Sequence, residues 1–152
     1  MNSKHIIIKK FLVEIIAFLF ILLFLYAAGT KLVDIERFRI VISKSPVLYS
    51  ISDPVSIIIP TAEILLSFLI AIPRARFFGL LGAFTLMVIF TAYIVVILQF
   101  SEEIPCACGG VLQSLGWKDH LIFNIVFSLI ALTGVLLELD SKRHSVIQKQ
   151  SV

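Results

Sequence analysis

Charged residues are scarce in this sequence. Asp, Glu, Lys and Arg make up only 15% of its residues, whereas soluble domains carry about 25%. So few charged groups cannot cover a water-facing globule, and the mean hydropathy of +1.06 points the same way. The composition therefore excludes an ordinary soluble domain and indicates a protein whose apolar surface faces lipid.

A nucleic-acid-binding surface is also missing. The net charge is +3 and the pI is about 9.0, but Lys and Arg lie at the ends of apolar runs and form no patch with interleaved aromatic residues. The chain has no linker, low-complexity tract or clear internal repeat. We therefore expect a single domain over residues 1–152, with no nucleic-acid partner.

Four apolar segments are long enough to cross a bilayer, whose hydrocarbon core of about 30 Å needs roughly 20 helical residues. They are residues 11–29, 54–72, 77–99 and 121–139. The first follows Lys9 and Lys10, as a signal peptide would. It is longer than the usual apolar signal core of about 7–15 residues and contains Glu14, so we interpret it as an uncleaved span. The predicted fold class is an all-α polytopic membrane protein, with four transmembrane helices in a compact bundle.

The distribution of Lys and Arg predicts the orientation. Eight of the thirteen basic residues fall on the side of the N-terminus, and the turn around Arg74 and Arg76 contains no acid. Because short cytoplasmic loops carry the excess of basic residues, both termini are expected in the cytoplasm. We expect an integral protein of a bacterial inner membrane. The connection between the third and fourth spans then lies on the periplasmic or extracellular side.

The connection between the first two spans, residues 30–53, shows a helical pattern. Its apolar residues recur at helical spacing, at Leu32, Ile35, Phe38 and Ile42. This predicts a short amphipathic helix at the membrane surface that ends before Pro46, with an irregular loop as the alternative.

The second span begins with two helix-start signals and contains a helix breaker. Asp53 is a predicted N-cap, and Pro54 suits the first turn. Pro60 removes a backbone donor and collides with the carbonyl of Ser56, which predicts a kink. Small residues on shared faces of the third and fourth spans predict close helix packing. They are Gly79 and Ala83, then Asn124, Ser128, Ala131 and Val135.

Glu63 is the most costly residue inside the spans. It follows Pro54 by nine residues, which at about 1.5 Å per residue puts it roughly 13–14 Å deep. A carboxylate there must be protonated, paired or turned toward a polar cavity. It is either a proton-handling or ligand-contacting group, or a neutral carboxyl hydrogen-bonded to Asn124, Tyr93 or the carbonyl freed at the kink. Glu14, one turn after Lys10, is expected to pair with that lysine.

The only two cysteines lie one residue apart, between the third and fourth spans. In "PCACGG", Cys106 and Cys108 follow a proline and precede Gly109 and Gly110. A bond between them closes a small, strained ring, and strained exposed disulfides exchange readily. Such a bond restricts the unfolded chain too little to act as a staple. On the extracytoplasmic side, where disulfides form and persist, this favours thiol–disulfide exchange.

Other readings of the cysteines stay open. They are a metal site with His120, reduced or incidental cysteines, and a bridge to another subunit or to a partner. Three ligands at Cys-x-Cys spacing do not match the usual zinc pattern of about two to four intervening residues, so no metal is predicted. His120 is either a base that raises the thiolate fraction or a residue of the membrane interface. Asp119 is a predicted helix cap.

A family resemblance rests on four stretches: "YAAGTKLVDIERFRIVISKSPVL", "IPTAEILLSFLIAIPRARFFGL", "FTAYIVVILQF" and "PCACGGVLQSLGWKDHLIFNIVF". They resemble the MauE/DoxX-like redox-associated membrane proteins, in the forms with a Cys-x-Cys-Gly-Gly loop. The resemblance implies a four-helix membrane bundle with a redox pair at Cys106 and Cys108, and it matches Glu63 to an acidic residue after the proline of the second span. It also implies a role in methylamine utilisation, where such a protein helps an extracytoplasmic, disulfide-rich dehydrogenase subunit mature beside a thioredoxin-like partner.

The predicted function is a membrane-embedded thiol–disulfide helper. One cysteine exchanges with an extracytoplasmic partner and the other resolves the mixed disulfide. The chain has no second cysteine pair for relaying electrons, and it shows no quinone motif, so a membrane quinone is a conjecture for the electron acceptor. The alternatives are a non-catalytic membrane subunit that docks a partner, and a small-molecule carrier that uses Glu63.

Overall fold

The computed structural model describes residues 3–45, 48–100 and 116–150, and every regular element in these ranges is helical. The helices are α1 (Ser3–Val33), α2 (Ile35–Ser43), α3 (Ser52–Ala71), α4 (Arg76–Phe100) and α5 (Trp117–Gln150), with one 3₁₀ turn, η1 (Tyr49–Ile51), before α3. The predicted all-α class is confirmed.

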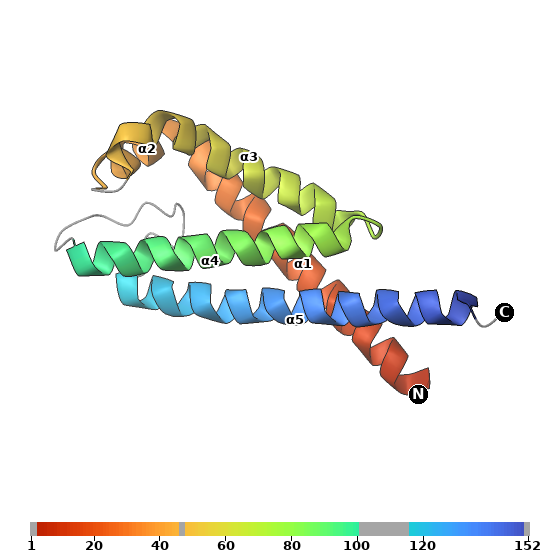
Figure 1. Cartoon of the computed structure of the whole chain (residues 1–152). Coiled ribbons are helices and arrows are strands. Elements are labelled where there is room, and N and C mark those ends of the chain that lie inside the picture. Colours follow the sequence, from red (N-terminus) through yellow and green to blue (C-terminus); the bar gives the residue numbers. More distant parts are fainter. Residues whose placement is uncertain (1–2, 46–47, 101–115, 151–152) are drawn as a thin grey trace.

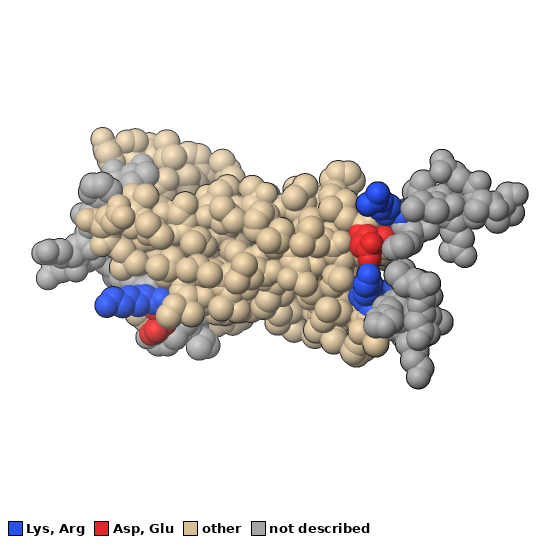
Figure 2. Space-filling model, turned by 60° about the horizontal axis from the view of Figure 1, so that its bottom comes forward, with Lys and Arg blue, Asp and Glu red and all other residues tan. Residues whose placement is uncertain are grey.

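Four helices are long and apolar enough to cross a membrane, and they overlap the four predicted segments. The candidate spans are Ile7–Val33, Tyr49–Ala71, Arg76–Gln99 and Lys118–Arg143. Large apolar side chains such as Phe11, Phe68 and Leu129 are exposed on the outer faces of the bundle. Figure 2 shows charged side chains at the two ends of one face and an uncharged band between them. The chain is an integral membrane protein, because only lipid can cover such a surface without penalty.

The two ends of the bundle differ. Both termini and the turn between α3 and α4 lie at one end, which we call the termini end (Figure 1). The short helix α2 lies at the other end, together with the last turn of α4 and the first turn of α5. Helices α4 and α5 run antiparallel side by side, and α1 packs mainly on α3.

The amphipathic helix α2 forms and ends before Pro46 as predicted, but Leu32, which was expected in it, belongs to α1. Asp34 caps its first turn by accepting a hydrogen bond from the backbone N–H of Arg37 at 3.2 Å. Phe38, Val41 and Ile42 are buried on its inner face. The inner face of α2 therefore covers the bundle at the end opposite the termini.

The predicted cap of α3 is wrong. The helix begins at Ser52, directly after η1, and no side chain caps it. Asp53 therefore falls in the first turn, where its carboxylate accepts a hydrogen bond from Arg39 Nη1 at 3.3 Å instead. Pro60 lies inside α3 as predicted, and the helix continues through it.

Close packing at the termini end depends on small residues. Ala83 and Ala131 are fully buried beside Leu80 and Ile70. A Cβ atom at Gly79 would lie 2.6 Å from the backbone nitrogen of Ile70 on α3. The small-residue faces predicted from the sequence are thus the faces on which α4 meets its neighbours.

Glu14 does not have the ion-pair partner expected from the sequence. Its carboxylate pairs with Arg76 Nη1 at 2.6 Å rather than with Lys10. Arg76 opens α4 at the same end of the bundle, and its guanidinium also donates to the Ile70 carbonyl at 3.2 Å. That second bond holds the guanidinium in place. The ion pair between α1 and α4 therefore forms instead of the expected pair within α1.

Replacing Gly79 with alanine should weaken the fold. The new methyl group would meet the backbone of α3, which cannot move as a flexible side chain can, and overpacking of this kind costs about 1–3 kcal/mol. The measurement is the free energy of unfolding of the purified protein in detergent. Gly29→Ala is the matched control, since a Cβ there meets nothing within 4 Å, and helix propensity favours it by up to about 1 kcal/mol. Equal effects of the two substitutions would rule out the close approach of α3 and α4.

Candidate functional site

A buried ion pair joins α1 to α3 inside the apolar part of the bundle. Lys31 Nζ donates a hydrogen bond to Glu63 Oε1 at 2.7 Å, and the two residues are 7% and 1% exposed. The ammonium also donates to the Ala27 carbonyl at 3.3 Å and lies 5.8 Å from the centroid of the Phe38 ring. A carbonyl, a carboxylate and an aromatic face therefore surround the positive charge.

Helix direction explains how a lysine near the end of α1 reaches a glutamate in the middle of α3. Side chains on a helix lean toward its N-terminus. The N-terminus of α1 lies at the far end of the bundle, so Lys31 leans into the membrane, whereas Glu63 leans back toward the end that carries α2. The two side chains thus converge although their helices run in opposite directions.

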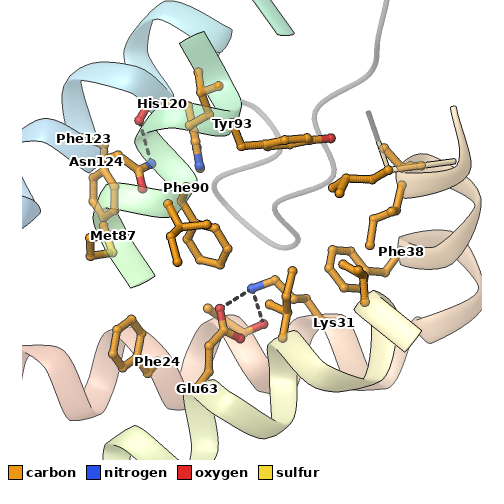
Figure 3. Close-up of a pocket in the computed structure, with 18 of the residues that line it drawn as sticks. Phe24, Lys31, Phe38, Glu63, Met87, Phe90, Tyr93, His120, Phe123 and Asn124 are labelled. Atoms are coloured by element: carbon orange, nitrogen blue, oxygen red, sulfur yellow. Dashed lines mark hydrogen bonds and ion pairs between the residues drawn. The ribbon is translucent and has the colours of Figure 1, made fainter. Parts of the chain in front are cut away.

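The ion pair forms part of the wall of a cavity of about 320 Å³. All five α-helices contribute to its lining, which is mainly aliphatic and aromatic; Phe24, Phe38, Phe90 and Phe123 are examples. Figure 3 shows Lys31 and Glu63 on one side of this pocket and His120 and Asn124 on another. The pocket is therefore an apolar chamber with a few polar groups set into its wall.

The polar groups on α5 come from its first two turns. Asn124 Nδ2 donates to the His120 carbonyl at 2.9 Å, and Asn124 is 2% exposed. The His120 ring is also buried and stacks against Phe123, with centroids 6.3 Å apart. The helix begins at Trp117, so Asp119 lies in its first turn.

Two buried acceptors in this wall have no hydrogen-bond partner among the residues that the structure describes. They are Glu63 Oε2 and Asn124 Oδ1. Buried polar atoms are almost always satisfied by protein or water, and an unsatisfied one costs about 1–3 kcal/mol. These acceptors can accept hydrogen bonds from a molecule in the pocket.

The predicted hydrogen-bond partners of Glu63, Asn124 and Tyr93, are wrong, although both residues lie near it. Tyr93 and Asn124 line the same pocket, but the donor to Glu63 is Lys31, which the sequence interpretation assigned to the external connection. Glu63 is therefore paired and also turned toward a cavity. The missed signal was the length of α1, because a helix that runs to Val33 places Lys31 within the span and requires an acid opposite it.

The remaining predicted site residues divide into two groups. His120 lies in the buried wall of the pocket rather than at an exposed interface. Cys106, Cys108, Gly109 and Gly110 lie outside the described residues. Within residues 3–45, 48–100 and 116–150, no group of three His, Cys, Asp or Glu side chains could hold a metal ion.

One comparison with known proteins finds a match. The family model described as "Methylamine utilisation protein MauE" matches residues 9–137. The matched range includes most of each membrane-crossing helix, every residue that lines the pocket, and both cysteines. No curated protein and no solved structure matches the chain.

Removing only one partner of the ion pair should be more harmful than removing both. Lys31→Met leaves Glu63 buried without its partner, and breaking a buried pair in this way costs about 3–5 kcal/mol. Lys31→Met combined with Glu63→Leu leaves no charge behind and should recover most of that loss. Free energies of unfolding for the two single variants and the double variant give the coupling energy.

The exposed pair of Arg39 and Asp53 supplies the control. Asp53→Asn should cost less than about 1 kcal/mol, as surface ion pairs do. A double variant at Lys31 and Glu63 that is no more stable than Lys31→Met would contradict the buried pair.

Proposed function

The chain belongs to the MauE family of methylamine utilisation proteins, and from this premise we propose that it is a membrane-embedded thiol–disulfide helper for an extracytoplasmic partner. The observation that carries the proposal is the pair Cys106 and Cys108, one residue apart and followed by two glycines. Both thiols of an otherwise cysteine-free chain stand in the segment that joins α4 to α5. A thioredoxin-like or disulfide-rich protein is the proposed partner.

The proposed orientation puts both termini in the cytoplasm of a bacterial inner membrane and the cysteine segment outside. Eight basic residues lie toward the termini end. Lys31 is buried in the bundle and no longer counts as a loop charge, so four remain on the opposite side, and this strengthens the bias. The helix ends that flank the cysteine segment lie at the opposite end from the termini (Figure 1). Such a placement would expose the thiols to an oxidising compartment.

The exchange chemistry uses both sulfurs. A thiolate of Cys106 or Cys108 attacks one sulfur of a partner disulfide, a mixed disulfide forms, and the other partner sulfur leaves as a thiolate. The remaining cysteine then attacks the mixed disulfide and forms the Cys106–Cys108 bond, which releases a partner dithiol. The same steps in reverse oxidise a partner dithiol, and in each direction one pair of electrons passes between the two sulfur pairs.

A small-molecule carrier is the second candidate, and the pocket around Glu63 favours it. In that case Glu63→Gln alone would abolish function while both cysteines remain dispensable. A non-catalytic docking subunit would instead keep its activity when both cysteines are replaced. Substituting each of these residues separately therefore distinguishes the alternatives.

Replacing one cysteine should trap the partner. Without the resolving sulfur, a Cys106→Ser or Cys108→Ser variant should accumulate a covalent adduct in native membranes, visible as a heavier band on a non-reducing gel. Dithiothreitol should release the partner for identification. The Cys106→Ser/Cys108→Ser double variant is the control and should form no adduct. If neither single variant forms an adduct and the double variant retains full activity, the exchange role is wrong.

The proposed orientation predicts which side of the membrane exposes the thiols. After reduction, a membrane-impermeant maleimide should label Cys106 and Cys108 in intact cells. In a chain lacking both native cysteines, Ser141→Cys at the termini end should be labelled only after permeabilisation. If Ser141→Cys is labelled in intact cells and Cys106 and Cys108 only after permeabilisation, the orientation is the opposite one and the proposed function is wrong.

A further inference from the structure

The pocket has the size and walls of a site for a lipid-soluble molecule. Its volume of about 320 Å³ lies at the lower end of ligand sites, which occupy about 300–1,000 Å³. Its walls carry the rings of Phe90 and Phe123 and the thioether of Met87. Most of the lining residues lie in the membrane-crossing helices, so a molecule that partitions into lipid suits this cavity.

The unsatisfied acceptors specify the polar character of that molecule. Glu63 and Asn124 are 1% and 2% exposed, and each leaves one oxygen unpartnered within the described part of the chain. The amide orientation of Asn124 is determined, because its nitrogen must face the His120 carbonyl to which it donates. Figure 3 shows the two side chains on different sides of the pocket. A fitting ligand therefore presents a hydrogen-bond donor at each of two places on an otherwise apolar body.

The charge of the site excludes a cation. Lys31 already compensates Glu63 at 2.7 Å, so the pair carries no net charge. An alkylammonium ion would add a second positive charge beside Lys31 in a medium of low dielectric, where like charges repel strongly. The donors must therefore be neutral, as hydroxyl groups are.

From these three observations we propose that the pocket binds a membrane hydroquinone. Its flat ring contacts the aromatic wall, and its two hydroxyl groups donate to Glu63 Oε2 and Asn124 Oδ1. The corresponding quinone presents only acceptors at those positions and meets two acceptors, so the pocket binds the reduced form more tightly.

The binding site depends on the pocket alone, whereas its use in catalysis rests on the proposed function. A Cys106–Cys108 dithiol that reduces a quinone gives up two electrons and two protons and becomes a disulfide. The quinone takes up the same electrons and protons and becomes the hydroquinone. Tighter binding of the reduced form drives this reaction forward, since each tenfold preference raises the potential of the bound couple by about 30 mV.

Direct binding tests the proposal. The full-length protein is placed in quinone-free phospholipid nanodiscs and titrated with a radiolabelled decyl benzohydroquinone and, separately, with its quinone. The hydroquinone should bind at one equivalent, at least threefold more tightly than the quinone. Asn124→Leu should weaken hydroquinone binding by about threefold to tenfold, the loss of one neutral hydrogen bond, and should not weaken quinone binding, because it removes an acceptor that faces a quinone oxygen.

Two further variants test the acceptors and the location. Glu63→Gln offers Lys31 an oxygen and turns an amide donor toward the ligand, so it should reverse the preference in favour of the quinone. Thr133→Val changes an exposed residue of α5 whose hydroxyl donates to the Leu129 carbonyl. It should bind both ligands as the unaltered chain does.

The cysteine variant separates the two proposals. Cys106→Ser/Cys108→Ser should bind hydroquinone with unchanged affinity, so a failed exchange role leaves the site intact. The site proposal is overturned if the hydroquinone and the quinone bind equally well and neither Asn124→Leu nor Glu63→Gln changes their binding. It is also overturned if native mass spectrometry finds only phospholipid in the pocket, or if methylammonium binds there in place of the hydroquinone.

Discussion

A cation and an anion that meet inside a bilayer constrain the rest of this molecule. Lys31 and Glu63 can be buried only together, because either charge alone would cost several kcal/mol in the apolar interior. Moving α1 or α3 along its axis by one turn, about 5.4 Å, would separate the two groups. Their contact therefore sets the relative position of the two helices. Phe38 lies over the same ammonium, so the position of α2 depends on that contact as well.

The bundle is closely packed at one end and open at the other. At the termini end, Gly79 brings α4 against α3, and a Cβ atom at Gly134 on α5 would lie 3.0 Å from the Ile16 side chain. From that end α3 and α4 diverge toward the end that carries α2 (Figure 1), where larger side chains and the charged pair surround the cavity. Small residues thus allow close helix packing at the termini end, whereas the site lies toward the other end, among mostly larger side chains.

The elements of this fold are readable in the sequence, but the contacts between them are not. Length and hydropathy predict the four spans, and helical spacing predicts α2, because these are properties of single segments. The N-cap predicted at Asp53 is wrong because the start of α3 depends on where η1 ends. The depth of Glu63 in its span shows that it is costly to bury, yet its partner Lys31 comes from another helix whose register no local pattern reveals. The buried position of His120 and the cavity itself depend likewise on how whole helices meet.

Neutrality would connect the pocket with the proposed thiol chemistry. Oxidation of a dithiol releases electrons and protons in equal number, and a quinone takes up the same set, so every reactant and product is uncharged. The pair of Lys31 and Glu63 cancels its own charge and leaves no counter-ion for a substrate that gains or loses charge. Because separating charge costs far more at low dielectric than in water, the proposed conversion of a bound quinone into a hydroquinone, which adds protons and electrons in equal number, would leave the charge at this depth unchanged. The family match alone does not select a substrate, whereas the self-compensating ion pair favours an uncharged ligand in the pocket.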